Sequence, residues 1–415
     1  MAEAEIIAVG SELLTPQRLD TNSLFITEQL NLLGIEIIRK QVIGDDRERL
    51  ATAIRSAIAS CDVLLLSGGL GPTEDDVTRD AVAAALNREL VFSEEQKAIL
   101  EQRFASIRRK MAEINLRQAF VIEGAEVLPN PHGSAPGQWV RAGSCSIFLL
   151  PGPPRELKAM LQNEVVPRLQ PLLPKQVIKV RSFRITGIGE SDLDALIAPV
   201  YSKYTNPVTT VLSSPGDLWV HLRARCDSEQ EADSLLHEVG NPIAQLLGDR
   251  VYSTDAEDTL ERVVARMLRE KGATISTAES CTGGLLASRL TEHGGSSDFF
   301  LGGFVTYTDQ QKIESLGVQP AVIAKHSAVS EPVATSMAEG ARNRTGSTYA
   351  LSVTGYAGPC GGTEKDPIGT VYIGIASPSR VHAVRVHYGS DRQRVRTLAT
   401  QAALDLVRRE MLNGR

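Results

Sequence analysis

Apolar runs and amphipathic stretches alternate along the first third of the chain. Ile6–Val9 and Ile35–Ile43 read as buried strands, and Asn22–Leu33 has the spacing of an amphipathic helix. A second helix over Arg47–Ser60 and a strand over Asp62–Leu66 follow. Strands alternating with helices of this length predict a parallel sheet covered on both faces. Ligands bind such sheets beyond the carboxyl ends of the strands.

Two turns rich in glycine and proline lie at predicted strand ends. Ser67–Pro72 follows the strand over Asp62–Leu66, and Pro151–Pro154 follows a strand over Ser146–Leu150. Glycine exposes backbone N–H groups, so the first turn, with a helix over about Val77–Leu86 behind it, suits a phosphate. The alternative is a tight turn whose neighbouring carboxylates only stabilise the helix dipole.

The middle of the chain has a different element order. Pro167–Pro174 carries three prolines and is predicted to be a linker. The order β-α-β-β-α, with a further strand near Val251, predicts a small ferredoxin-like α+β sandwich. No chemical motif stands out here, so we expect a spacer or a dimer contact. The predicted elements are Gln176–Ile185, Ser191–Val200, Val208–Leu212, Leu218–Cys226 and Ser228–Leu247.

The last third returns to alternating helices and strands. Its first helix has apolar residues on one face, from Leu260 to Leu268. A strand over Thr274–Thr277 leads into the turn Ala278–Gly284. Further strands are expected at Gly303–Thr308, Tyr349–Thr354, Thr370–Ala376 and Val381–His387, with a last helix from Asp391 to Arg409.

Length and composition fit this picture. At 415 residues, two to three domains are expected. The pattern places them at 1–168, 172–252 and 256–415. A hydrophobic content of 42% with 23% charged residues is ordinary for a globular protein.

Charge and cysteine content exclude several classes of protein. A net charge of −6 disfavours direct binding of nucleic acid or of an anionic membrane, since both need a basic face. The five cysteines are scattered without a CxxC pattern, which argues against a disulfide framework or a structural zinc site. We expect a soluble, cytoplasmic protein, because no signal-peptide pattern or long apolar run appears.

Motifs of the first segment match a known family. Its first domain resembles the molybdopterin-binding-like domain of CinA (competence/damage-inducible) proteins over roughly residues 4–168. Pro16 departs from the family, which more often has glycine there. The matching motifs are Gly10–Leu14, Asp20–Asn22, Gly68–Thr78, Asn115 with Gln118–Ala119, Asn130–Gly137 and Pro151–Pro154.

The resemblance implies a nucleotide-type ligand at the first turn and, in some members, metal-dependent hydrolysis of ADP-ribose. The expected cofactor is a divalent cation, Mg²⁺, Mn²⁺ or Co²⁺, with K⁺ as an addition; such cations take oxygen ligands. Asp76 would be the principal metal ligand, helped by Asp45 or Asp46, with Asp75 and Thr78 in support. The substrate would be held by Gly68, Gly69, Gly71, Pro151 and Gly152.

The turn Ala278–Gly284 offers a second kind of chemistry. Ser280 in a strand-to-helix turn can be a nucleophile with backbone N–H groups nearby for an oxyanion. The alternative is that Ser280 or Thr282 only caps the following helix. A serine nucleophile needs a base, and Lys312 can serve if burial leaves it neutral. The alternative is that Lys312 is a solvated surface lysine. His326 and His293 are the other candidates for the base.

Motifs of the last segment resemble the CinA C-terminal domain over about residues 256–410. They include Ala278–Gly284, Gly294–Ser297, Phe304–Tyr307, His326–Ser330 and Pro367–Val371, with Lys312, Thr354-Gly355, Ala357–Pro359, Lys365 and Asp391-Arg392. The resemblance implies hydrolysis of the carboxamide of nicotinamide mononucleotide to nicotinate mononucleotide and ammonia. No cofactor is expected there, and the family implies a homodimer.

Roles follow from this resemblance and from the chemistry of amide hydrolysis. Ser280 is the expected nucleophile, Lys312 the base and Tyr307 an assisting group. Ser297 is the main rival nucleophile. Cys281 ranks third, because it follows Ser280 in an alternating strand and would point to the opposite side. Oxyanion or substrate contacts are expected from Cys281, Thr282, Gly283, Gly284, Thr354, Gly355 and Arg392.

Some residues depart from the family's pattern. Thr308-Asp309 replaces the usual Ser-Asn, and Asp309 could pair with Lys312 and raise its pKa. Tyr356, Cys360 and Ser390 are further departures. Two other readings stand beside the hydrolase: a molybdopterin-type ligand-binding protein, and a non-enzymatic competence or repair adaptor.

Overall fold

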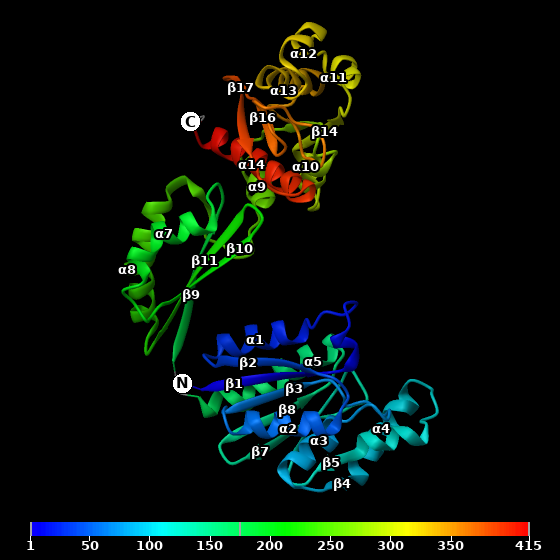
Figure 1. Cartoon of the computed structure of the whole chain (residues 1–415). Coiled ribbons are helices and arrows are strands. Elements are labelled where there is room, and N and C mark those ends of the chain that lie inside the picture. Colours follow the sequence, from blue (N-terminus) through cyan, green and yellow to red (C-terminus); the bar gives the residue numbers. More distant parts are fainter. Residues whose placement is uncertain (1, 174–175, 414–415) are drawn as a thin grey trace. The chain divides into compact units, whose positions relative to one another are not determined.

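The computed structural model describes residues 2–173 and 176–413. The chain divides into two compact units, residues 1–178 with 226–228, and residues 179–225 with 229–415. Figure 1 traces the elements of both units along the chain. Among the described residues, no helix combines the length and the apolar character needed to cross a bilayer.

The first unit contains a six-stranded sheet in the order β2-β1-β3-β8-β7-β6. Its first four strands are parallel to one another, as the sequence predicts. β7 and β6 are added antiparallel at one edge, by hairpin-like pairing that the sequence pattern did not reveal. The strands are β1 (Glu3–Val9), β2 (Glu36–Ile43), β3 (Val63–Ser67), β6 (Glu126–Leu128), β7 (Gly137–Ala142) and β8 (Cys145–Leu150).

Helices cover both faces of this sheet (Figure 1). On one face, α2 (Arg47–Ile58) and α3 (Thr78–Leu86) pack on apolar side chains of β1, β3 and β8. On the other face, α1 (Asn22–Leu32) and α5 (Pro154–Met160) do the same with the alternate residues of these strands. Burial on both faces explains why β3 and β8 are continuous apolar runs.

Further elements lie beyond the parallel strands. They are η1 (Ser11–Leu14), α4 (Glu94–Ser106), η2 (Glu113–Ala119) and the small sheet of β4 (Leu90–Phe92) with β5 (Phe120–Ile122). The proline-bearing segment predicted as a linker is helical as far as Leu172, in α6 (Val166–Leu169) and η4 (Gln170–Leu172). Pro167 and Pro171 each occupy a first-turn position, where a missing N–H is tolerated. Residues 174–175 lie outside the described part.

The middle segment has the predicted order of elements. Its four-stranded sheet runs β10-β11-β9-β12, and β11 alternates buried and partly buried residues, as expected for a strand with one face on the core. The elements are β9 (Val177–Ile185), α7 (Glu190–Tyr201), β10 (Val208–Ser214), β11 (Asp217–Cys226), α8 (Glu229–Leu247), η5 (Gly248–Arg250) and β12 (Val251–Ser253).

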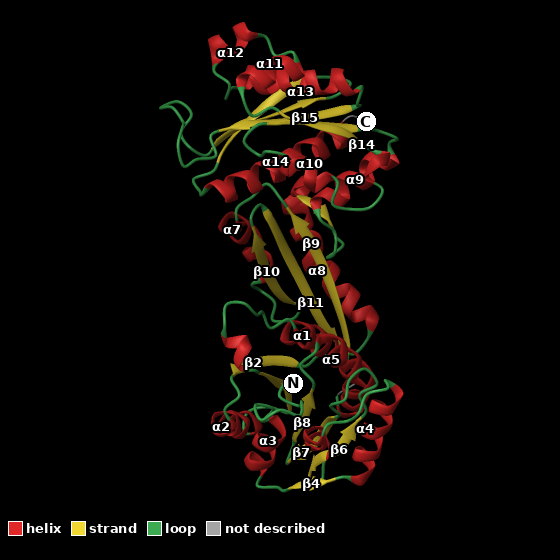
Figure 2. Ribbon diagram, turned by 90° about the vertical axis from the view of Figure 1, so that its right-hand side faces the viewer, coloured by secondary structure: helices red, strands yellow, loops and turns green. Residues whose placement is uncertain are grey.

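The C-terminal segment is a five-stranded mixed sheet between two helical layers (Figure 2). One layer, with α9 (Leu260–Glu270), α10 (Leu285–Leu290) and α14 (Arg392–Asn413), packs on one face, and α11 (Asp309–Leu316), α12 (Pro320–His326) and α13 (Glu331–Thr345) lie on the other. The order is β14-β13-β15-β16-β17. The strands are β13 (Ile275–Glu279), β14 (Phe300–Val305), β15 (Tyr349–Gly355), β16 (Thr370–Ala376) and β17 (Val381–His387).

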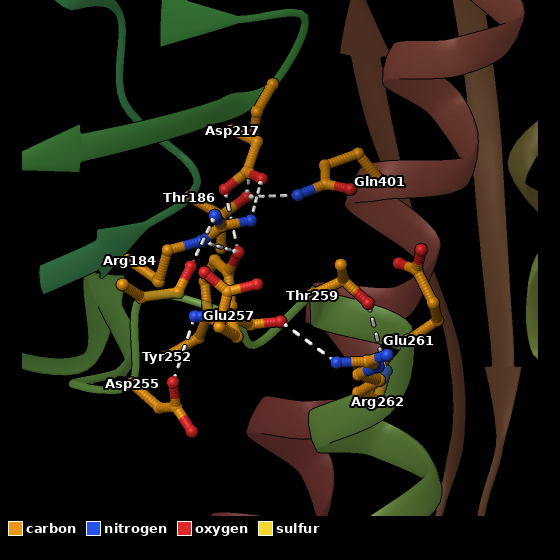
Figure 3. Close-up of polar contacts among 12 residues, drawn as sticks. Arg184, Thr186, Asp217, Tyr252, Asp255, Glu257, Thr259, Glu261, Arg262 and Gln401 are labelled. Atoms are coloured by element: carbon orange, nitrogen blue, oxygen red, sulfur yellow. Dashed lines mark hydrogen bonds and ion pairs between the residues drawn. The ribbon is translucent and has the colours of Figure 1, made fainter. Parts of the chain in front are cut away.

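A polar cluster joins the middle segment to the C-terminal segment within the second unit (Figure 3). Arg184 pairs with Asp217 at 2.7 Å, and Tyr252 donates to Asp217 at 2.8 Å. On the other side of the joint, Gln401 of α14 donates to the Thr186 hydroxyl at 3.5 Å. α14 therefore contacts the middle segment near Gln401, while its first residue, Arg392, lies in the candidate site described next.

Candidate functional site

Ser280 directly follows the carboxyl end of β13, which is parallel to β14 and β15. Its backbone N–H donates to Val353 O at 2.8 Å, so Ser280 stays fixed to the edge of the sheet. The side chain does not cap the next helix. The carboxylate of Glu279 caps that helix instead, accepting hydrogen bonds from Gly284, Leu286 and Ala287 N–H at 3.0, 3.0 and 2.8 Å.

Lys312 reaches the Ser280 hydroxyl from α11. Its side chain is only 2% exposed, with Nζ 3.3 Å from Ser280 Oγ and 3.2 Å from the Thr306 carbonyl oxygen. Burial lowers the pKa of Lys312, since a charged ammonium is disfavoured away from water. The sequence-level alternative of a solvated lysine is wrong for this residue.

Asp309 lies 3.9 Å from Lys312 Nζ and is largely exposed, so it pairs weakly. Its charge raises the pKa of Lys312, but the effect of burial is larger and the net shift is downward. Asp309, which departs from the family's pattern, therefore favours the charged form of Lys312, but less strongly than burial disfavours it.

Cys281 is buried beside Ser280, and burial raises the pKa of its thiol to about 11. The guanidinium groups of Arg392 and Arg396 lower that pKa, but by less than burial raises it. Both arginines therefore lie near the turn. A thiol with this pKa is protonated at neutral pH and is a poor nucleophile.

The donors next to Ser280 differ from those expected. Gly283 N–H donates to Ser280 O at 3.1 Å, and Gly284 N–H is occupied by Glu279, so neither can bind an oxyanion. Within the described residues, the backbone N–H groups of Cys281 and Thr282 donate to no backbone carbonyl of the turn or the neighbouring strands. Thr282 Oγ1 is likewise buried without a partner there.

Tyr307 and Arg392 form the outer side of the site. Arg392 donates to Tyr307 Oη at 2.9 Å and to Gly358 O at 2.7 Å. Tyr307 is 57% exposed, and in the described structure its hydroxyl hydrogen-bonds to Arg392 and not to Ser280 or Lys312. Thr354 donates to Ala328 O at 2.9 Å, so its hydroxyl supports a neighbouring loop, next to Gly355 at the end of β15.

Arg396, one turn along α14 from Arg392, belongs to the same region and was missed from the sequence. It donates to Thr282 O at 2.6 Å, and its Nε is buried without a partner in the described part of the chain. A cavity of about 360 Å³ lies beside it, lined by Leu285, Arg392, Gln393, Arg396 and Thr397. The i, i+4 spacing of the two arginines was the available signal.

Ser297 lies at the other end of the sheet from Ser280. It is in η6 (Ser296–Asp298), just before β14, whose first residue pairs with Ile275, the first residue of β13. The five residues of β13 separate the two serines by roughly 16 Å. The structure thus does not bring Ser297 together with Lys312, and within the described residues neither His293 nor His326 forms a hydrogen bond with Ser280.

The glycine turn of the first unit lines a separate pocket of about 620 Å³. Gly68 and Gly69 have positive φ, and a Cβ on either would overlap Val9 O or Thr78 Oγ1. Thr78, fully buried, donates to Gly68 O at 2.7 Å and so holds the turn instead of facing a ligand. Buried Arg79 supports it too, donating to Leu70 O and Gly71 O.

Only some of the backbone N–H groups expected to bind a phosphate are without an acceptor in the described residues. Gly68 N–H donates to Leu150 O and Gly71 N–H to Asp76, which leaves Gly69 and Leu70 N–H without acceptors in the described residues. Pro151 and Gly152 line the same pocket from the end of β8.

Of the four predicted metal ligands, Asp45, Asp75 and Asp76 line this pocket and Asp46 does not. Asp46 caps α2, accepting from Glu48 and Arg49 N–H, and does not line the pocket. Asp76 accepts from Gly71 and Thr73 N–H at 2.7 and 2.8 Å, and Asp75 accepts from the Thr73 hydroxyl. Asp45 accepts from Ser11 N–H at 2.9 Å. Across residues 2–173 and 176–413, no three acidic, histidine or cysteine side chains are grouped to hold a metal, so these residues do not fit a ready-made centre.

Comparison with known proteins decides the family. Residues 257–411 match the CinA C-terminal domain, residues 5–171 the probable molybdopterin binding domain, and residues 180–253 the damage-inducible protein CinA KH domain. A CinA-like protein of Solibacter usitatus is 56% identical over 409 residues, covering 99% of this chain and 98% of that protein. The chain belongs to the CinA family.

Further members of the CinA family also match this chain. A putative competence-damage inducible protein of Clostridium botulinum (strain Kyoto / Type A2) is 40% identical over 409 residues, covering 99% of this chain and 100% of that protein. A crystal structure of the competence/damage inducible protein CihA from Agrobacterium tumefaciens is 38% identical, covering 36% of this chain and 92% of that chain, with a TM-score of 0.36. The family models and the full-length relatives confirm the predicted family, and the sheets and helices of the structure confirm the α/β fold class.

Three further departures from the CinA pattern lie in two loops of the C-terminal segment. Tyr356 Oη is 3.4 Å from the Ser327 hydroxyl, and Cys360 is exposed in the loop between β15 and β16. Ser390 immediately precedes the Asp391 carboxylate that accepts from Arg394 N–H at the start of α14. None of these side chains forms a hydrogen bond with Ser280 or Lys312 in the described structure.

Proposed function

We propose that the C-terminal domain hydrolyses the carboxamide of nicotinamide mononucleotide to nicotinate mononucleotide and ammonia. The observation that carries this proposal is the 3.3 Å separation between Ser280 Oγ and Nζ of buried Lys312. A serine becomes a nucleophile when an adjacent base takes its proton, and a lysine can do so when its pKa is lowered.

The proposed reaction proceeds through an acyl-enzyme. Neutral Lys312 takes the Ser280 proton while Oγ bonds to the amide carbon, and Cys281 and Thr282 N–H donate to the oxyanion. Lys312 then returns the proton to the leaving nitrogen as the C–N bond breaks and ammonia departs. Water, deprotonated by Lys312, attacks the ester and releases the carboxylate and Ser280.

Arg392 and Arg396 are the proposed contacts for the substrate's phosphate. The cavity beside them lies next to the Ser280–Gly284 turn, and an unpartnered guanidinium N–H suits a phosphate oxygen. Tyr307, held by Arg392, would close the outer side of the site.

Ammonia release from nicotinamide mononucleotide tests this proposal. Ser280→Ala should lose activity, whereas Ser297→Ala, a serine of the same domain at the opposite sheet end, should keep it. Retained activity in Ser280→Ala would overturn the proposed nucleophile. No turnover by the unmodified protein would favour the non-enzymatic adaptor. We also expect a homodimer, which light scattering would test.

A second proposal concerns the glycine-turn pocket of the first unit. Its size, its open Gly69 and Leu70 N–H groups and its polar lining favour a pyrophosphate-containing nucleotide such as ADP-ribose. Because the carboxylates are not grouped, a divalent cation would need ligands from the nucleotide and water as well. Release of AMP from ADP-ribose with Mg²⁺, Mn²⁺ or Co²⁺, with and without K⁺, tests whether the pocket hydrolyses its ligand. A molybdopterin-type ligand is the alternative occupant.

A further inference from the structure

Two carboxamide oxygens in the first unit are buried without hydrogen-bond partners among the described residues. They are Gln118 Oε1, from η2, and Asn22 Oδ1, from the first residue of α1. Gln118 as a whole is 1% exposed. Because buried polar groups are nearly always paired, two such acceptors in one region point to a donor that belongs to a ligand.

The orientation of each carboxamide is fixed by its neighbours. Asn22 Nδ2 donates to Gly152 O at 2.7 Å and to Ser67 Oγ at 3.0 Å. Gln118 Nε2 faces Leu70 O at 3.5 Å. Backbone carbonyl oxygens only accept, so flipping either amide would set two oxygens against each other. The unpartnered atoms are therefore the acceptors.

Both residues line the glycine-turn pocket, although they come from segments almost a hundred residues apart. Asn22 approaches beside Ser67 and Gly152, and Gln118 approaches beside Leu70. The pocket thus combines open backbone donors at Gly69 and Leu70, which suit an anion, with buried acceptors that an ionised phosphate cannot satisfy. A ligand that fits both must carry hydroxyl or amino hydrogens as well as a phosphate.

We propose that Gln118 and Asn22 accept hydrogen bonds from the sugar hydroxyls of a pyrophosphate-containing nucleotide, and so select ribose over deoxyribose in this pocket. The nucleotide identity rests on the second proposed function above, but the readout is binding and does not require hydrolysis. Neutral hydroxyl donors match carboxamide oxygens, whereas a cationic donor would be drawn to the Asp45, Asp75 and Asp76 carboxylates of the pocket. A site with buried acceptors rejects an analogue that lacks the hydroxyl, because the acceptor stays unpaired.

The test is calorimetric titration of the full chain with ADP-ribose and with its 2′-deoxy and 2″-deoxy analogues, which lack a hydroxyl on one ribose or the other. Each titration is run in EDTA and again with Mg²⁺. The variant is Gln118→Met, which keeps the length of the side chain and removes its acceptor. Gln118→Leu, which also removes the acceptor, is a second variant in case the methionine variant fails to fold.

Gln138 provides a matched control in the same unit. It is also fully buried, but its carboxamide is satisfied by Ile122 N–H at 2.9 Å and Phe120 O at 3.0 Å, and it does not line the pocket. Gln138→Met should therefore lower stability without changing the preference for the hydroxylated ligand.

We expect the unmodified protein to bind ADP-ribose at least about tenfold more tightly than one of the deoxy analogues, as one lost hydrogen bond implies. That ratio should fall below about threefold in Gln118→Met and in Gln118→Leu, and persist in Gln138→Met. Equal affinities for all three ligands, no binding in either buffer, or an unchanged ratio in Gln118→Met would overturn the proposal. Ribose-selective binding without AMP release would support it while contradicting the proposed hydrolysis.

Discussion

Lys312 Nζ lies 3.3 Å from Ser280 Oγ, on a side chain with only 2% of its surface exposed. No carboxylate is closer to this ammonium than Asp309 at 3.9 Å within the described residues. A buried lysine without a close counter-ion destabilises a fold, so its position is better explained by chemistry than by packing.

Replacing Lys312 with methionine should separate activity from stability. The variant keeps the apolar stem and removes the base, so kcat for ammonia release should fall by roughly 1,000-fold or more. Its melting temperature should stay equal or rise, because a desolvated amine is lost. Lys325→Met, on α12, is the control and should change neither quantity. Turnover retained by Lys312→Met would rule out the proposed base.

The Asp309 carboxylate should set the pH at which the proposed deamidation begins. It raises the pKa of Lys312, so Asp309→Asn should lower that pKa further. Neutral Lys312 would then form at lower pH, and the acid limb of the kcat/KM profile should move down by a few tenths of a pH unit, as expected for an exposed pair. Asp298→Asn, at the opposite end of the sheet, should leave the limb in place. A shift to higher pH would contradict this account.

Cys281 should be dispensable for the chemistry. Its thiol is buried with a pKa of about 11, so almost none is thiolate at neutral pH. Cys281→Ala should retain activity within about fivefold, and iodoacetamide should label Cys281 far more slowly than the exposed Cys360, as peptide mapping can measure. Loss of turnover in Cys281→Ala with Ser280→Ala still active would reverse the two assignments.

The sequence predicted most of what depends on local pattern. The strands that end at Ser67 and Glu279 were predicted to end at Leu66 and Thr277, one and two residues earlier, and Ser280 was correctly placed in the turn after the second strand. The approach of Lys312 to Ser280 rested on family resemblance alone, because thirty-two residues and a strand separate them. The burial that lowers the pKa of Lys312 depends on the tertiary fold, and the local sequence pattern does not show it.

Other features could not be predicted because they depend on which hydrogen bonds are already made. Glycines in a turn indicate exposed N–H groups, yet Gly284 donates to Glu279 and Gly71 to Asp76. Asp46 is a further example, because the family resemblance implied a metal ligand and the side chain instead caps α2. Competition between local caps and ligands is decided by three-dimensional placement, which a single sequence does not record.

The joint between the middle and C-terminal segments should depend on Asp217. This carboxylate pairs with Arg184 and accepts from Tyr252 in a largely buried cluster (Figure 3). Asp217→Ala should lower the free energy of unfolding by about 3–5 kcal/mol, because Arg184 is left buried without its partner. Asp233→Ala, which breaks the exposed pair with Lys179, should cost less than about 1 kcal/mol. Urea denaturation measures both, and equal effects would contradict the assigned importance of burial.

Arg396 should recognise the phosphate of the substrate without taking part in the chemistry. Its Nε has no partner in the described residues and its guanidinium lines the cavity next to the Ser280 turn. Arg396→Gln should raise KM for nicotinamide mononucleotide by about 10–100-fold, the loss expected for a charge-assisted hydrogen bond, while kcat changes less. Nicotinamide riboside lacks the phosphate, so its kcat/KM should change by less than about threefold in the same variant. Equal losses for nucleotide and riboside would mean that Arg396 acts only by holding Thr282 O, to which it donates at 2.6 Å.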